Sequence, residues 1–156
     1  MKKVTLWCLL SMMLSGFAQA QSLVVEKAWA TPTFAMAKMG AAYGVIANST
    51  EQTISITGLQ ISPEIAASAE LHETYMKGDM ASMRQLEFPY ELAGGEKLEL
   101  APRAKHIMLM GLQKPLQEGM TFDVVFTTKD AENLVMTVTV TAADKHERQP
   151  IHKHHH

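Results

Sequence analysis

Short alternations of apolar and polar residues, separated by glycine, proline and asparagine, recur along most of the chain. The alternation is clearest in residues 53–61, TISITGLQI, where apolar side chains return at every second position, as in a strand with one buried face. Other β-rich runs end in turn residues, and they cover residues 23–30, 40–49, 69–76, 80–88, 106–112, 120–128 and 134–142. A further short strand is expected within residues 92–102. One helical turn fits residues 63–69.

Many short strands at regular spacing predict an all-β fold, an antiparallel sandwich or barrel. Two turn signals divide neighbouring runs and predict hairpins, one at Lys77-Gly78-Asp79 and one at Lys129-Asp130. No long amphipathic helical pattern competes with this interpretation. We therefore expect the chain to be built from hairpins around one hydrophobic core.

The first 20 residues predict a signal peptide that is cleaved on export. Lys2 and Lys3 precede a mostly apolar run over residues 4–17, which is too short to span a bilayer comfortably. Ala18-Gln19-Ala20 has the small-x-small pattern of a cleavage site. We expect one mature domain, residues 21–143, located in the periplasm with no stable membrane insertion. A short membrane anchor is the alternative interpretation of the apolar run.

Composition excludes several classes of site. The single cysteine, Cys8, lies in the predicted signal peptide, so the mature chain lacks the thiolates of zinc–cysteine, iron–sulfur and blue-copper centres. Removing Lys2 and Lys3 leaves a formal charge of 12 minus 16, or −4, and no basic patch favours nucleic-acid binding. Without a Ser/His/Asp constellation, a phosphate-binding glycine loop or a carboxylate pair, the sequence predicts no enzyme.

Methionine and histidine concentrate in two segments. Residues 72–83, HETYMKGDMASM, hold one histidine and three methionines, and residues 106–112, HIMLMGL, hold one histidine and two methionines. In the second segment these side chains alternate with Ile107 and Leu109, which are the better candidates for the core. The row of histidine and methionine is therefore expected to face solvent or a shallow pocket.

A hairpin at residues 77–79 brings the end of the first segment back beside its start. If this hairpin adjoins the second segment, four side chains converge: His72, Met83, His106 and Met108. Thioether sulfur is soft and uncharged and selects Cu(I), whereas zinc prefers histidines, thiolates or carboxylates. Methionine is also a common core filler, so the pattern alone leaves a packing role open.

The spacing of His72, ten residues, Met83, a longer gap, and His106-x-Met108 resembles the signature of the periplasmic Cu(A)C-type copper chaperone family. The segments GAAYGVIAN, AELHETYM, LAGGEKLELAP and HIMLMGL are also similar to that family, over residues 28–140. The resemblance implies a cupredoxin-like Greek-key β-sandwich that binds Cu(I) through these four residues.

One departure from the family pattern is the length of the gap between Met83 and His106. The family's gap between the first methionine and the second histidine is 21 residues, and the interval Arg84–Lys105 has 22. We place the extra residue in the turns around Pro89 or Pro102, because loops tolerate insertions. A register shift would instead turn the second His/Met pair toward the core. Of the other methionines, Met39 and Met110 are expected to line the edge of the site.

The resemblance also implies a function and a partner. Family members carry Cu(I) toward the copper A centre of cytochrome c oxidase, so the expected partner is that oxidase subunit or another copper chaperone, and the expected state is a monomer. A periplasmic copper-buffering or copper-resistance protein without a dedicated client is the alternative. A metal-free adhesion or structural sandwich is a further alternative.

The chain ends in a polar, histidine-rich segment, and we expect residues 144–156 to be a flexible tail. Imidazole suits Cu(II), and the candidate ligands of this secondary site are His152, His154, His155 and His156. A remnant of a purification tag is the alternative, but Lys153 interrupts the histidine run, which favours a native tail.

If the tail captures Cu(II), a chain that ends at Pro150 should take up less Cu(II) than the full chain, because it lacks four imidazoles. Equilibrium dialysis of both proteins against the same Cu(II) solution measures the difference. Equal uptake by the two chains would contradict this assignment.

Overall fold

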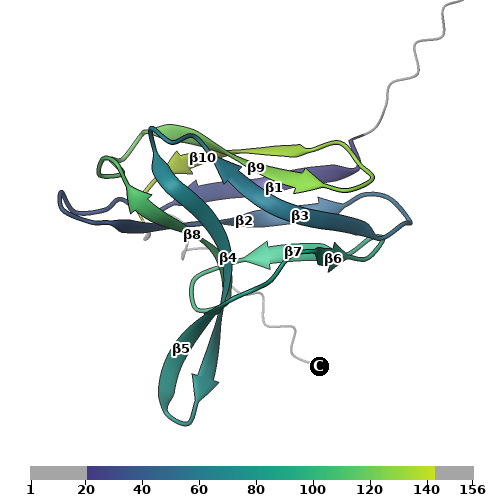
Figure 1. Cartoon of the computed structure of the whole chain (residues 1–156), viewed down its shortest axis with the longest axis horizontal. Helices are drawn as coiled ribbons and strands as arrows, with labels where there is room; N and C mark the ends of the chain where they lie inside the picture. Colours follow the sequence, from purple (N-terminus) through teal and green to yellow (C-terminus); the bar gives the residue numbers. More distant parts are fainter. Residues whose placement is uncertain (1–20, 143–156) are drawn as a thin grey trace, which may run out of the picture.

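The computed structural model describes residues 21–142 (Figure 1), so the predicted signal peptide and the histidine-rich tail lie outside the described residues. No helix in the described part is long and apolar enough to cross a membrane. Residues 21–142 form ten strands: β1 (Leu23–Ala30), β2 (Met39–Asn48), β3 (Ile54–Ile61), β4 (Ala66–Lys77), β5 (Met80–Gln85), β6 (Tyr90–Leu92), β7 (Lys97–Leu100), β8 (Lys105–Leu112), β9 (Thr121–Thr128) and β10 (Leu134–Val140).

The strands follow one hydrogen-bonded path in the order β5-β4-β8-β2-β1-β10-β9-β3-β6, and β7 pairs with β2 beside this path. The path curls around a shared core, and the β4–β5 hairpin projects from the body of the fold (Figure 1). The predicted all-β, cupredoxin-like sandwich is thus confirmed. One pairing differs from the antiparallel prediction, because β1 and β10 run parallel at Trp29↔Thr139.

The period-two pattern sorts side chains between core and solvent. In β10 the apolar residues Leu134, Met136 and Val138 are buried, while the intervening positions are exposed. Full burial of each large apolar side chain contributes roughly 1.5–3 kcal/mol. The largest fully buried side chains are Phe126, Ile46, Ile56, Leu71, Leu92, Leu98, Ile107, Leu109, Leu116, Met136, Val124 and Val138.

Two local predictions need correction. The proposed helical turn over residues 63–69 is wrong beyond Ala66, because β4 begins there and Ala69 pairs with Leu109 in β8. Before the strand the chain forms one turn, in which Ile65 N and Ala66 N both donate hydrogen bonds to Ser62 O. The strand expected over residues 80–88 ends at Gln85, and β6 is an additional short strand that the sequence pattern missed.

Strand β2 is shared between two partners along one edge. Its first half, Met39 to Ala42, pairs with β8, and its second half, Gly44 to Ala47, pairs with β7. Its other edge pairs with β1, where a Cβ on Gly44 would lie 2.3 Å from Lys27 O, so this close approach requires glycine. The branch point in β2 places Ala41 and Tyr43 next to the end of β8.

Asn48 is a buried polar residue that ties the far end of β2 to two turns. Its Nδ2 lies 2.7 Å from Gln52 O, 3.0 Å from Leu92 O and 3.1 Å from Ala93 O. Its Oδ1 accepts hydrogen bonds from the backbone and hydroxyl of Thr50, at 3.0 and 2.7 Å. The amide therefore has partners for both its donor and acceptor sides, as a buried polar group requires.

Replacement of Asn48 by aspartate should destabilise the fold by about 1–3 kcal/mol, because the carbonyls lose their donor and face a carboxylate. Exposed Asn133 is a matched control, because its Oδ1 accepts a hydrogen bond from Thr128 N. An aspartate at this position can accept the same hydrogen bond. We expect Asn133→Asp to change the free energy of unfolding by less than about 0.5 kcal/mol. Urea unfolding at neutral pH measures both changes, and equal losses in the two variants would contradict this role of Asn48.

Candidate metal centre

The four residues singled out by the sequence share one face of the sheet. His72 in β4 lies directly opposite His106 in β8, so the two imidazoles are cross-strand neighbours. Met108 lies two residues further along β8 on the same face. Met83 in β5 is paired with Thr74, which is two residues from His72 in β4. Three neighbouring strands thus present the histidines and methionines to one side.

The longer gap before the second His/Met pair does not turn that pair inward. Ile107 and Leu109 are both fully buried on the opposite face of β8, as the alternation predicts. Strand β8 pairs with β4 in a continuous register from Lys105 to Leu112. The interval Arg84–Lys105 includes β6, β7 and their turns, and it returns the chain with the core side chains of β8 facing inward.

His106 is more buried than the sequence suggests, with 5 % of its surface exposed. The ring of Tyr43 lies beside it at a centroid distance of 6.4 Å, and Trp29 lies 4.5 Å from Tyr43. The Nδ1 of His106 is 3.0 Å from Ala104 O, so the neutral ring that donates Nδ1–H to this carbonyl keeps a lone pair on Nε2. A backbone acceptor on one nitrogen is a common way to orient a metal-binding histidine.

His72 is oriented by a carboxylate instead. Its Nε2 lies 3.0 Å from Glu70 Oε2, and its ring centroid is 6.1 Å from that of His106. When Nε2–H donates to Glu70, the lone pair of the neutral ring is on Nδ1. In each histidine, one ring nitrogen therefore donates a hydrogen bond to an acceptor within the protein, and the lone pair of the other nitrogen can bind a metal ion.

The free nitrogen of His106 has a route to solvent. In the described part of the chain, no buried side-chain nitrogen or oxygen lacks a hydrogen-bond partner. The Nε2 of His106 has no such partner, so it must reach the accessible surface despite the burial of the ring. It can do so in an adjoining pocket.

That pocket has a volume of about 400 Å³, and three of the four predicted ligands line it: Met83, His106 and Met108. Its remaining lining comes from Ala41, Tyr43, Thr74, Ala81, Pro102 and Arg103. His72 is not part of this lining, and it lies beside His106 with its Nε2 bonded to Glu70. The structure thus brings three of the residues to one hollow and holds the fourth next to it.

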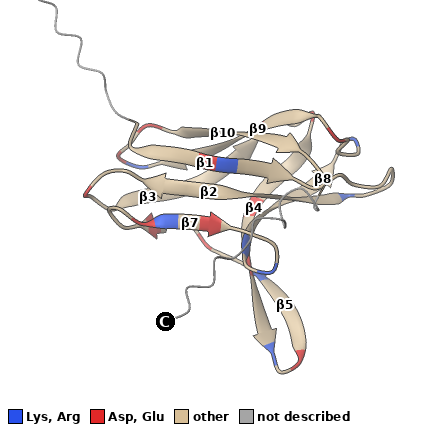
Figure 2. Cartoon of the chain, turned by 180° about the vertical axis from the view of Figure 1, so that it is seen from behind, with Lys and Arg blue, Asp and Glu red and all other residues tan. Residues whose placement is uncertain are grey.

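The opposite face of the β4–β5 hairpin carries a charge cluster. Arg84 Nη2 lies 2.9 Å from Glu73 Oε2, and Lys105 Nζ lies 3.8 Å from Glu73 Oε1. The hydrogen bond from Arg84, aided by the charge of Lys105, lowers the pKa of the Glu73 carboxyl. Arg84 also lies over the Tyr75 ring, 5.6 Å from its centroid. Figure 2 shows charged residues at the base and the tip of this hairpin, which carries Met83.

Sulfur is the distinctive donor of this centre. Within residues 21–142, no group of three or more histidine, cysteine, aspartate or glutamate side chains gathers in a way that could hold a metal ion. Two imidazoles and two thioethers form a neutral, soft donor set, which suits Cu(I). Sequence reasoning missed Glu70, although its position two residues before His72 placed it on the same strand face.

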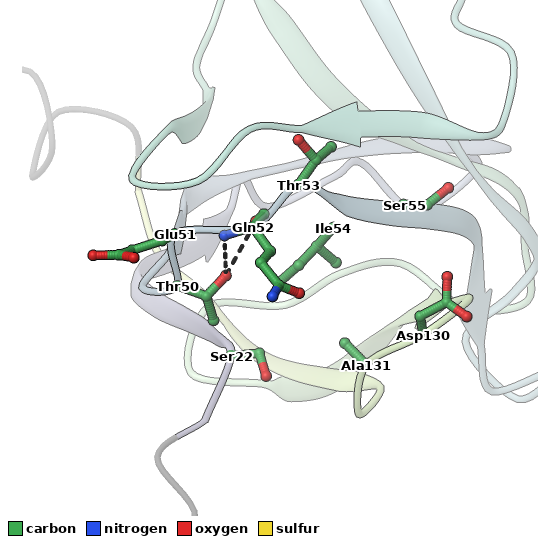
Figure 3. Close-up of a pocket in the computed structure, with 9 residues that line it drawn as sticks. All are labelled: Ser22, Thr50, Glu51, Gln52, Thr53, Ile54, Ser55, Asp130 and Ala131. Atoms are coloured by element: carbon green, nitrogen blue, oxygen red, sulfur yellow. Dashed lines mark hydrogen bonds between the residues drawn. The ribbon is translucent and has the colours of Figure 1, made fainter.

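Another hollow lies at the turn between β2 and β3 and contains polar side chains (Figure 3). Thr50 Oγ1 accepts a hydrogen bond from Gln52 N at 3.3 Å and donates to Asn48 Oδ1, so the threonine hydroxyl serves the turn itself. Ala41 in β2 lines the His/Met pocket, whereas this hollow lies beyond Asn48 at the end of the same strand. At 3.3 Å per residue, the strand between Ala41 and Asn48 spans roughly 23 Å. This polar hollow is therefore separate from the histidines and methionines.

The chain matches the LpqE-like family over residues 23–140. It is 34% identical over 122 residues to a Leifsonia xyli subsp. xyli protein named as lipoprotein Lxx21020, covering 78% of this chain and 71% of that protein. The solution structure of CuI-DR1885 from Deinococcus radiodurans is 30% identical with a TM-score of 0.58, covering 81% of this chain and 84% of that chain.

The apo PCuAC domain from PmoF1 has a TM-score of 0.61 at 19% identity, covering 78% of this chain and 94% of that chain, which is a likeness of fold. The family match spans nearly all of the described residues. The chain therefore belongs to the LpqE-like family.

Proposed function

We propose that this protein is a copper chaperone that holds one Cu(I) ion through His72, Met83, His106 and Met108. The observation that carries the proposal is the pocket that Met83, His106 and Met108 line together, with His72 opposite His106 on the neighbouring strand. The CuI form of DR1885 and the copper-bound PCuAC domain from PmoF2 support copper as the ion. The donor set supports the reduced state, because thioether favours Cu(I) over harder ions.

The same geometry favours exchange of the ion over permanent storage. All four donors are neutral, and thioether sulfur needs no deprotonation before it binds. Met83 is 59 % exposed on the projecting hairpin, so a partner's ligands can approach the ion from that side. His106, in contrast, is fixed by its backbone acceptor and the Tyr43 ring. We infer that the ion is released by loss of Met83 first and of the buried imidazole last.

Glu70 acts as a positioning residue in this proposal. Its carboxylate holds His72 Nε2 at 3.0 Å and also lies 3.4 Å from the hydroxyl of Ser68. A carboxylate partner fixes the tautomer and the orientation of a histidine ligand and raises its basicity. We propose that His72 completes the set of four donors through Nδ1, while its Nε2 keeps this hydrogen bond.

We place the protein outside the cytoplasm, in the periplasm, on the basis of the predicted signal peptide and the lipoprotein name of its Leifsonia relative. A Met/His site suits such an oxidising compartment, because it avoids the disulfide formation that a cysteine pair would risk there. The proposed client is the copper A centre of cytochrome c oxidase. A copper buffer without a dedicated client would use the same site, and an assay of transfer distinguishes the two.

The combined substitution Met83→Leu and Met108→Leu should reduce Cu(I) affinity by at least about 100-fold, because loss of even an outer partner of a metal ligand costs 10–100-fold. Leucine preserves size and removes sulfur. Met80→Leu is the matched control, because Met80 is also exposed on the hairpin but pairs with Lys77 on the other face. Competition with a chromophoric Cu(I) chelator measures the affinities, and wild-type affinity in the double variant would remove Met83 and Met108 from the site.

Transfer of copper separates the chaperone from the buffer. We expect the Cu(I)-loaded protein to metallate the apo copper A subunit of the oxidase faster than an equal concentration of Cu(I)–chelator complex of matched affinity, because docking brings the exposed ligand Met83 to the client. Samples are oxidised with ferricyanide at set times, and the visible absorption of the resulting mixed-valence copper A centre measures how much of it has been loaded. Equal rates from the protein and the chelator would favour the buffering role.

A further inference from the structure

We propose that Met39 and Met110 form a second, thioether Cu(I) site beside the His/Met site, with Met108 lying between the two. The two methionines are directly opposite each other in the antiparallel pairing of β2 and β8. The next pair on the same face joins Ala41 to Met108. Directly opposite residues have Cβ atoms about 4.5–5.5 Å apart, so two flexible thioether side chains reach one ion from these positions.

Core packing does not account for these methionines. Met39 is 53 % exposed, and Met110 is only partly buried. Met136 shows the contrasting case, because it is completely enclosed in the core. Isolated exposed apolar residues are common, but Met39 and Met110 are cross-strand partners on the face that carries both histidines.

A separate hollow opens at this end of the face. It has a volume of about 300 Å³, and its lining includes Met39, Met108, Phe34 and Pro32. Met108 also lines the larger pocket that contains Met83 and His106. The sulfur-bearing side chain of Met108 therefore borders both hollows, and it can serve as a ligand on either side.

The chemistry of this second site is softer and weaker than that of the first. Its donors are thioethers without an imidazole, so it selects Cu(I) by softness and not by charge. Met110 pairs on its other side with Ser68, a poor ligand for a soft ion. Cu(I) should fill the His/Met site first and this site second. Movement of an ion between them is a ligand exchange at Met108, with no change in oxidation state and no proton released.

The test is an anaerobic Cu(I) titration of the protein labelled with ¹³C at the methionine methyl groups, compared with the variant Met39→Leu/Met110→Leu. In the wild-type protein, the first equivalent should shift the Met83 methyl signal, and the second should shift those of Met39 and Met110. The double variant should retain the Met83 response and bind about one Cu(I) fewer per chain in competition with a chelator. Met80→Leu, at an exposed position off this face, should match the wild-type protein.

Unchanged Met39 and Met110 signals during the second equivalent, or equal Cu(I) stoichiometry in the double variant and the wild-type protein, would overturn the proposal. The exposed sulfurs would then belong only to an apolar surface. The Met83 signal reports the His/Met site independently. Its failure to respond, with Met39 and Met110 still responding, would count against the proposed function and support the second site.

Discussion

The pairing of β4 with β8 is the constraint on which the rest of the site depends. This register sets His72 opposite His106 and, through the period of two, sets Met108 on the same face and Leu109 in the core. A shift of one residue would exchange the two faces of β8. The buried side chains Ile107 and Leu109 therefore determine the position of the metal-binding face, because their exposure would cost roughly 1.5–3 kcal/mol each.

The surroundings divide the site into a fixed half and an open half. His106 belongs to a row of rings that continues through Tyr43 to Trp29, and a backbone carbonyl holds its Nδ1. Met83 is on a hairpin that projects from the body of the fold (Figure 1) and is exposed to solvent. A fixed imidazole beside a flexible, unbranched thioether would suit the proposed copper chaperone, which would have to bind an ion and later release it.

Much of the fold follows from the sequence, because strands with one buried face alternate visibly. The run at residues 23–30 predicted β1 with its observed bounds, and the turn at Gly78 predicted the β4–β5 hairpin. Strand β6 was missed because three residues are too few to show a period. The parallel pairing of β1 and β10 was also missed, since it joins segments over a hundred residues apart and has no local signal.

The site was predictable in its residues and less so in its geometry. The spacing singled out His72, Met83, His106 and Met108, and the structure places all four on one face. The carboxylate of Glu70 on His72 and the burial of His106 depend on side-chain packing between strands, which periodicity does not encode. The assignment of these four residues as ligands remains a proposal that rests on geometry and donor chemistry.

X-ray absorption spectroscopy of the protein with one equivalent of Cu(I) tests the central claim most directly. Our account predicts an inner shell that contains sulfur from Met83 and Met108 together with nitrogen from His72 and His106. A shell of nitrogen and oxygen alone would contradict it, because the thioethers would then have no part in holding the ion.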